Sequence, residues 1–175
     1  MDGLMHYYYG NGKGKTTAAL GLALRACGCG KRVVIVQFLK NWKCGELSSL
    51  DSLPDVTVFR GMPPHSKFVF EMSDEEKVAV KALHDKSLVD ALELVRNGLC
   101  DLLILDEAED AYSLGVLDQG LFMGLIADKP KALELVVTGH GADASIIGAA
   151  DYVTEMVKRK HPYDEGVKAR KGIEF

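Results

Sequence analysis

Two short apolar runs constrain the fold of this chain more than any other feature. The segments Arg32–Phe38 (RVVIVQF) and Asp101–Asp106 (DLLILD) place β-branched and aliphatic residues in succession rather than in alternation with polar ones. Strands that are buried on both faces have this pattern, which is typical of a parallel sheet covered by helices. Because helical stretches separate the runs, we predict a three-layer α/β fold.

The remaining elements follow the same alternation. A serine three residues before a glutamate, Ser73 and Glu76, predicts the start of a long helix that ends near Asn97, with Gly98 stopping it. Further helices are expected at Lys15–Cys27 and Asp118–Ala127, and further strands at Leu4–Tyr9, Val56–Phe59, Ala132–Thr138 and Tyr152–Thr154. We therefore expect a mainly parallel sheet of about six strands in a single domain, residues 1–175.

Composition narrows the class of protein. With 47% hydrophobic and 26% charged residues, the balance is that of an ordinary globular chain. The net charge of -4 argues against a nucleic-acid-binding surface. No apolar run approaches the roughly 20 residues of a membrane span. The four cysteines have no disulfide or zinc spacing, so we expect reduced thiols and a cytoplasmic location.

A glycine-rich loop, Gly10–Thr17 (GNGKGKTT), joins the first expected strand to the first helix. Glycines let a backbone fold around phosphate oxygens, and the helix N-terminus adds partial positive charge. Lys15 is expected to reach the phosphates and Thr16 to ligate Mg²⁺. The spacing departs from the standard P-loop, whose first glycine would fall at Tyr9. The loop predicts an ATP·Mg²⁺ site with a shorter or differently shaped cradle.

The expected strand Asp101–Asp106 ends in two carboxylates, Asp106 and Glu107. Ligands of parallel sheets lie beyond the carboxyl ends of the strands, so these acids should face the loop. A carboxylate there can hold Mg²⁺ directly or through water. The following Glu109 and Asp110 are expected to be solvated rather than metal ligands.

Beyond the loop, the chain resembles the ATP:corrinoid adenosyltransferases of the CobA/CobO/BtuR type. The likeness is collinear and spans almost the whole length, and it is carried by the segments Gly10–Ala19, Val36–Lys40, Gly45–Glu46, Leu105–Glu107, Val137–Gly139, Ala150–Asp151, Val153–Glu155, Lys160–Tyr163, Gly166–Ala169 and Gly172–Phe175. The fold implied is a three-layer P-loop NTPase of the RecA-like kind.

The resemblance implies a reaction in which the 5′-deoxyadenosyl group of ATP is transferred to Co(I) of a corrinoid and inorganic triphosphate is released. The cobalt is the nucleophile, so no protein base is needed. The tasks left to the protein are to position the substrates and to neutralise the leaving triphosphate. An external reductant such as a flavoprotein and a homodimeric assembly are also implied. The preferred corrinoid and nucleotide are left open.

The resemblance also assigns residues. Lys15, Thr16 and Glu107 carry the catalytic role, with Thr16, Glu107 and Asp106 near the metal. The nucleotide is held by Gly10, Asn11, Gly12, Lys13, Gly14, Lys15, Thr16, Thr17 and His140. The corrinoid is expected to contact Phe68, Phe70, Glu46 and Trp42, with the two phenylalanines covering its lower face.

Two departures from the family pattern keep alternatives open. Phe70 stands where members carry Trp, and His140 stands where Arg is usual. Phe68 and Phe70 are alternatively core residues on one face of a strand. A kinase or ATPase would cut at the γ-phosphate and yield ADP, but it needs a base that the sequence does not indicate. A corrinoid-binding or ATP-sensing module without turnover is the other alternative. His161 is expected to be structural.

Overall fold

A computed structural model describes residues 2–40, 44–60 and 67–174. Its elements, in chain order, are β1 (Met5–Tyr9), α1 (Lys15–Cys27), β2 (Val33–Gln37), α2 (Gly45–Leu50), β3 (Val56–Arg60), the 3₁₀ turn η1 (Val69–Glu71), α3 (Asp74–Arg96), β4 (Leu102–Asp106), α4 (Ala108–Ser113), α5 (Gln119–Ala127), β5 (Glu134–Thr138), α6 (Ala144–Ala149), β6 (Tyr152–Glu155) and η2 (Pro162–Glu165).

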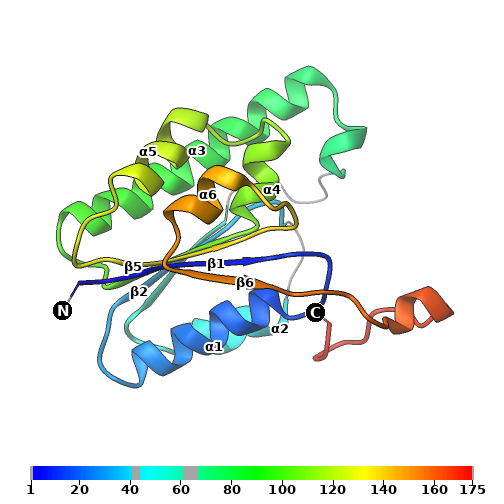
Figure 1. Cartoon of the computed structure of the whole chain (residues 1–175), viewed down its shortest axis with the longest axis horizontal. Coiled ribbons are helices and arrows are strands. Elements are labelled where there is room, and N and C mark those ends of the chain that lie inside the picture. Colours follow the sequence, from blue (N-terminus) through cyan, green and yellow to red (C-terminus); the bar gives the residue numbers. More distant parts are fainter. Residues whose placement is uncertain (1, 41–43, 61–66, 175) are drawn as a thin grey trace.

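The strands form one sheet in the order β3-β2-β4-β5-β1-β6. Every neighbouring pair is parallel, which confirms the expected parallel sheet of six strands. Strand β5 lies between β1, which leads into the glycine loop, and β4, which ends in Asp106. Because all strands point the same way, the loops that follow them meet along one edge of the sheet. In Figure 1 this is the edge toward which the arrows of β1 and β6 point.

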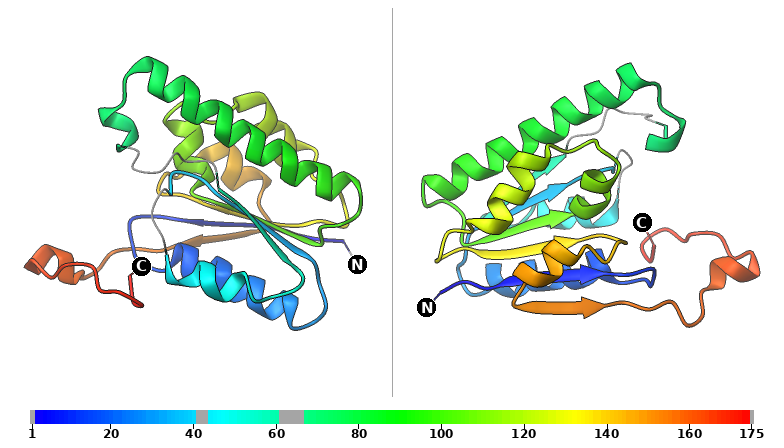
Figure 2. Two further views of the ribbon diagram at one scale, coloured as in Figure 1. Left: turned by 180° about the vertical axis from the view of Figure 1, so that it is seen from behind. Right: turned by 45° about the horizontal axis from the view of Figure 1, so that its top comes forward.

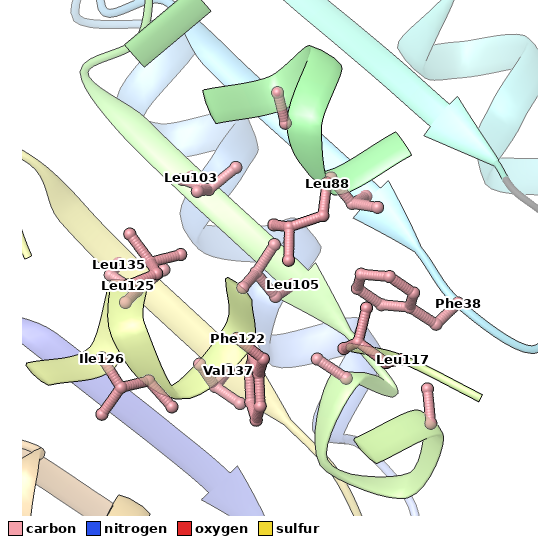
Figure 3. Close-up of a cluster of buried hydrophobic side chains, with 14 of the residues drawn as sticks. Phe38, Leu88, Leu103, Leu105, Leu117, Phe122, Leu125, Ile126, Leu135 and Val137 are labelled. Atoms are coloured by element: carbon pink, nitrogen blue, oxygen red, sulfur yellow. The ribbon is translucent and has the colours of Figure 1, made fainter. Parts of the chain in front are cut away.

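Helices cover both faces of the sheet. Helices α3, α4, α5 and α6 lie on one side, and α1 and α2 lie on the other (Figure 1). Successive strand residues point to opposite faces. Accordingly, Leu103 and Leu135 join the core beneath α3 and α5 (Figure 3), and Val34 belongs to the same cluster. Ile35 and Ile104 instead join the core against α1. This two-sided burial explains why the strand runs are apolar throughout.

Helix α1 approaches the sheet with small side chains. Ala19, Ala23 and Ala26 are buried at intervals of four and three residues, so they form one face of the helix. Small residues there let the helix backbone lie close to the strands. The start of α1, which carries Lys15, is thereby held against the carboxyl edge of the sheet.

The long helix α3 begins as its sequence predicts. The Ser73 hydroxyl accepts from the Glu76 N–H, and the Glu76 carboxylate accepts from the Ser73 N–H at 2.8 Å. The helix ends at Arg96, and Gly98 follows with φ 65°. Three short helices, α2, α4 and α6, were not predicted. No helix in the described part of the chain is both long and apolar enough to cross a bilayer.

The segment after β6 runs away from the sheet and then turns back toward the glycine loop. Both views in Figure 2 show η2 at the far end of this excursion and the C-terminus close to the body of the molecule. The return is fixed by Lys13, whose ammonium lies 3.2 Å from a Glu174 carboxylate oxygen. The end of the chain therefore forms part of the wall around the loop.

Candidate functional site

The loop between β1 and α1 depends on its glycines for its shape. Gly10 has φ 107° and Gly14 has φ 118°, values that side chains disfavour. Gly12 is needed for space, because a Cβ there would lie 2.7 Å from the Met156 carbonyl oxygen. The Gly12 N–H donates to that same oxygen. Gly12 therefore fits the loop against the segment after β6, and its amide is not free in this conformation.

Two loop lysines have protein partners that phosphate oxygens could replace. The Lys15 ammonium donates to the carbonyl oxygens of Gly10, at 2.6 Å, and Gly12, at 3.1 Å. Burial lowers the pKa of Lys15, although carboxylates that include Glu107 oppose this effect. Lys13 donates to Glu174 on the returning tail. Both cations lie on the loop where a polyphosphate is expected.

Asp106, at the end of β4, is a fully buried carboxylate that organises the site. Its Oδ1 accepts from the Thr16 and Thr138 hydroxyls at 2.8 Å each. Its Oδ2 accepts from the Lys40 ammonium at 2.6 Å and from the Gln37 amide at 3.4 Å. The carboxylate thus joins side chains from α1, β5, β2 and the segment after β2.

Glu107, which follows β4, has an uncommon backbone conformation. Its φ of 60° lies in the left-handed region, where a residue other than glycine is strained. Its N–H donates to the Thr138 hydroxyl at 2.9 Å, which stabilises that turn. Its side chain keeps 26% of its surface exposed. Burial raises the pKa of Glu107 to about 7, and the nearby Lys40 opposes this rise.

Lys40 lies deep in the site and is only 7% exposed, and its role here was not predicted from the sequence. Burial alone would lower the pKa of Lys40, but the carboxylates of Asp106 and Glu107 outweigh this effect and raise it. The preceding Leu39 has φ 57°, and its N–H donates to the Nε2 atom of buried His84 at 3.3 Å. This turn directs Lys40 back to the sheet edge.

The acids in α4 contact the loop after β5, and the expectation that both are solvated is wrong for Glu109, whereas Asp110 stays partly exposed. Glu109 is 4% exposed and accepts from the Gly141 N–H at 2.7 Å. Asp110 accepts from the His140 ring nitrogen Nδ1 at 3.0 Å. This hydrogen bond raises the pKa of His140 above its ordinary value, although partial burial opposes the rise. His140 is therefore cationic over a wider pH range than a free imidazole.

These side chains surround one cavity of about 930 Å³ at the carboxyl edge of the sheet. Glu46 and Glu107 line it. So do most of the residues that were predicted to bind the nucleotide, namely Asn11, Gly12, Lys13, Gly14, Lys15, Thr16, Thr17 and His140. Gly10 and Asp106 are buried and do not line the cavity. Residues not assigned from the sequence also contribute, notably Lys40, Thr138 and the tail segment Gly172–Glu174. His161 lines the cavity too, and its Nδ1 accepts from the Tyr163 N–H at 3.2 Å at the start of η2, so it has a structural partner.

Phe68 and Phe70 do not line this cavity, and they are not core residues either. The two residues are 63% and 76% exposed, and their rings stack with centroids 5.4 Å apart and an angle of 6° between their planes. They flank and enter η1, which Figure 1 shows at the same side of the molecule as the strand tips. The alternative that they lie on the face of a core strand is wrong. Trp42 lies outside the described residues.

The oxygen donors fit a small divalent ion bound together with a polyphosphate. The Thr16 hydroxyl directs its hydrogen toward Asp106 and accepts from Lys40 with one lone pair, which leaves its second lone pair for a cation. Glu107 adds a partly exposed carboxylate at the cavity wall. The described residues contain no cluster of three His, Cys, Asp or Glu side chains suited to a metal. Mg²⁺ suits such a site, since it is commonly held by one or two protein oxygens plus substrate phosphates.

A phosphate-binding loop placed this way on a parallel sheet defines the P-loop class of nucleotide-binding proteins. Comparison with known families makes the assignment more specific. The chain belongs to the ATP:corrinoid adenosyltransferase family BtuR/CobO/CobP, whose family model matches residues 1–175.

Individual relatives agree with this assignment along nearly the whole chain. A corrinoid adenosyltransferase of Pseudomonas aeruginosa is 35% identical over 174 residues, covering 99% of this chain and 84% of its own. The corrinoid adenosyltransferase CobA of Salmonella typhimurium is 33% identical over 176 residues, covering 99% and 86%. A corrinoid adenosyltransferase of Escherichia coli K12 is 32% identical, again covering 99% and 86%.

Proposed function

We propose that this chain transfers the 5′-deoxyadenosyl group of ATP to Co(I) of a corrinoid, with the triphosphate bound by the Gly10–Thr17 loop. The observation that carries this proposal is the meeting of Lys15, Thr16 and Glu107 at one cavity in a chain of this family. In the reaction, the electron pair of Co(I) forms the cobalt–carbon bond to C5′. The C5′–oxygen bond breaks, and its electrons leave with the triphosphate.

The protein's main task in this reaction is to stabilise the leaving group. The triphosphate gains charge as the C5′–oxygen bond breaks, and cations that are already in place stabilise it without reorganising. Lys15 supplies one such charge once its ammonium exchanges the loop carbonyls for phosphate oxygens. Lys13, two residues earlier in the loop, supplies another once it exchanges Glu174 for phosphate. His140, which is hydrogen-bonded to Asp110, supplies a third positive charge at the position where the family pattern has an arginine.

Mg²⁺ fits the oxygens of Thr16 and Glu107, and when bound it supplies further positive charge to the triphosphate. Two contacts within the protein hold the expected Mg²⁺ ligands in place. Asp106 fixes the Thr16 hydroxyl, and Thr138 fixes the Glu107 backbone. Both residues are therefore held in position before the nucleotide arrives.

The corrinoid is expected on the side where Phe68 and Phe70 are exposed. A stacked pair of rings open to solvent is unusual for side chains of this size, and flat macrocycles offer an apolar face of matching chemistry. Covering the lower face of a Co(II) corrinoid would displace its axial ligand and make the centre easier to reduce. Glu46, which lines the cavity at the start of α2, is placed to contact either substrate.

The reduction itself requires an electron donor outside this chain, such as a flavoprotein, because the sequence contains no flavin or iron–sulfur motif. We also propose that the chain works as a homodimer, by analogy with its family.

The activity is tested by anaerobic incubation with ATP, Mg²⁺ and chemically reduced cobalamin, followed by absorbance and by analysis of the phosphate products. A light-sensitive alkylcobalamin together with an equimolar amount of triphosphate is the expected result. Formation of ADP without a change in the corrinoid would instead indicate a kinase or ATPase. Saturable ATP binding without any product would indicate a binding module.

A further inference from the structure

The lone pairs of the Asp106 carboxylate are all occupied by hydrogen-bond donors of the protein, so none is left for a metal ion. Each carboxylate oxygen accepts at about two positions. Oδ1 already accepts from the hydroxyls of Thr16 and Thr138, and Oδ2 accepts from Lys40 and Gln37. Asp106 is also fully buried and does not line the cavity. A metal ion could bind it only by displacing a protein donor.

Lys40 is the donor that balances the charge of Asp106. Its ammonium lies 2.6 Å from Asp106 Oδ2, 3.2 Å from Thr16 Oγ1 and 3.8 Å from Glu107 Oε1. These three oxygens belong to the side chains that are predicted from the sequence to lie near Mg²⁺. A side-chain cation therefore already occupies the space between them.

The position of Lys40 is built into the backbone around it. Strands β2 and β4 are paired, and the Phe38 N–H continues this pairing by donating to the Asp106 carbonyl oxygen. The chain then turns at Leu39, whose N–H is held by His84, and His84 in turn donates from Nδ1 to the Val116 carbonyl oxygen at 2.8 Å. The ammonium is thus directed to Asp106 by contacts from three separate elements.

We infer that Lys40 is the permanent counter-ion of Asp106, so that a divalent ion arriving with the nucleotide is bound by Thr16 and Glu107 and not by Asp106. This inference rests on the proposed function only for the identity of the nucleotide. It assigns Asp106 a positioning role: it orients the Thr16 hydroxyl and anchors Lys40. Glu107, which lines the cavity, is then the carboxylate that contacts the metal.

One consequence is that the protein without nucleotide should bind divalent ions weakly. The ammonium of Lys40 repels a second cation and occupies one lone pair of the Thr16 hydroxyl. Removing that charge while keeping a similar shape should leave two carboxylates, the buried Asp106 and the cavity-lining Glu107, without a compensating cation. Metal binding would then no longer depend on the phosphates.

The test uses Mn²⁺ as the probe and follows the electron paramagnetic resonance signal of the free ion. Without nucleotide, Lys40→Met should bind Mn²⁺ about tenfold or more tightly than the unmodified protein. Lys40→Arg, which keeps the charge, should bind as the unmodified protein does. Lys86→Met is the matched control, because it removes an ammonium that lies 2.6 Å from Asp90 on the surface of α3.

A second arm adds ATP and compares the two carboxylates directly. Glu107→Gln should remove most of the gain in ATP affinity that Mn²⁺ provides, and Asp106→Asn should keep most of it. This arm needs no Lys40 variant, so it remains decisive if Lys40→Met does not fold. The inference is overturned if folded Lys40→Met binds Mn²⁺ no more tightly than the Lys86→Met control, or if Asp106→Asn loses the Mn²⁺ effect as fully as Glu107→Gln.

Neither arm contains a corrinoid. Failure of adenosyl transfer would therefore count against the proposed function and leave this result untouched, while an unexpected Mn²⁺ result would leave the transfer reaction in place.

Discussion

Replacing Phe70 with alanine should separate the reaction of Co(II) corrinoid from that of Co(I). Phe70 is 76% exposed and its ring contacts that of Phe68, so truncation removes little buried surface. Losing a ring pair costs about 0.5–1.5 kcal/mol, and exposed substitutions otherwise cost about 0.5 kcal/mol or less. We therefore expect the midpoint of thermal unfolding to fall by about 6 °C or less for a chain of this size.

The effect on catalysis should be larger and selective. If the pair covers the lower face of the corrinoid, transfer from Co(II) plus reductant should fall about tenfold or more, equivalent to ~1.4 kcal/mol in the barrier. Transfer from preformed Co(I) should fall about threefold at most, since no axial ligand then needs displacing. Both assays are run anaerobically on one preparation, with alkylcobalamin formation followed by absorbance.

Two variants serve as controls for Phe70→Ala. Phe70→Trp keeps a stacking ring and should retain both activities. Leu99→Ala removes an exposed apolar side chain just before β4, at the opposite edge of the sheet, and should change neither activity. Equal losses from Co(II) and Co(I) would refute the axial-ligand role. A fall in the unfolding midpoint well beyond about 6 °C would show that the ring is packed in the solution structure.

Three further predictions concern residues that line the cavity. Lys15→Met and Thr16→Val should each lower transfer by about 100-fold or more while the circular dichroism spectrum is unchanged; near-normal turnover in either variant would exclude the loop assignment. His140→Ala should weaken ATP binding by about fivefold at pH 6.5, where the raised pKa of His140 keeps the imidazole of the unmodified protein protonated. The difference between the two proteins should shrink as the pH rises through that pKa, because His140 then loses its charge. His140→Arg should bind ATP with no such difference in pH dependence, and a pH-independent effect of His140→Ala would refute the charge argument. Glu174→Gln should tighten ATP binding about two- to threefold by freeing Lys13, measured by calorimetry, and weaker binding would show that the tail supports the site.

The sequence predicted the fold well where the signal is local. Helix α1 has the predicted bounds, Lys15–Cys27, because Gly14 and Gly28 mark its two ends. The capping pair of Ser73 and Glu76 likewise sets the start of α3. Helix α6 was missed because it is too short for helical periodicity to be visible. It depends instead on an Asp143 cap and on burial of one isoleucine.

The site was predictable to the extent that residue type and position decide a role. Lys15, Thr16 and Glu107 follow from a loop and a strand end, and the structure brings all three to one cavity. Lys40 and Glu109 did not follow, because each depends on a partner far along the chain. Lys40 meets Asp106 across 66 residues, and Glu109 meets Gly141 across 32. No local pattern encodes such pairs.

The three lysines among the cavity-lining residues of the described chain differ in how easily a triphosphate can recruit them. Lys15 is held by neutral carbonyl oxygens, and Lys13 by a carboxylate on a partly exposed tail residue, so both can exchange their partners for phosphate at small cost. Lys40 is held by a buried carboxylate, and separating that pair would leave an uncompensated charge inside the protein, at a cost of about 3–5 kcal/mol. The first two cations are therefore available to follow the leaving group. The third keeps the Thr16 hydroxyl and the end of β4 fixed while the leaving group departs.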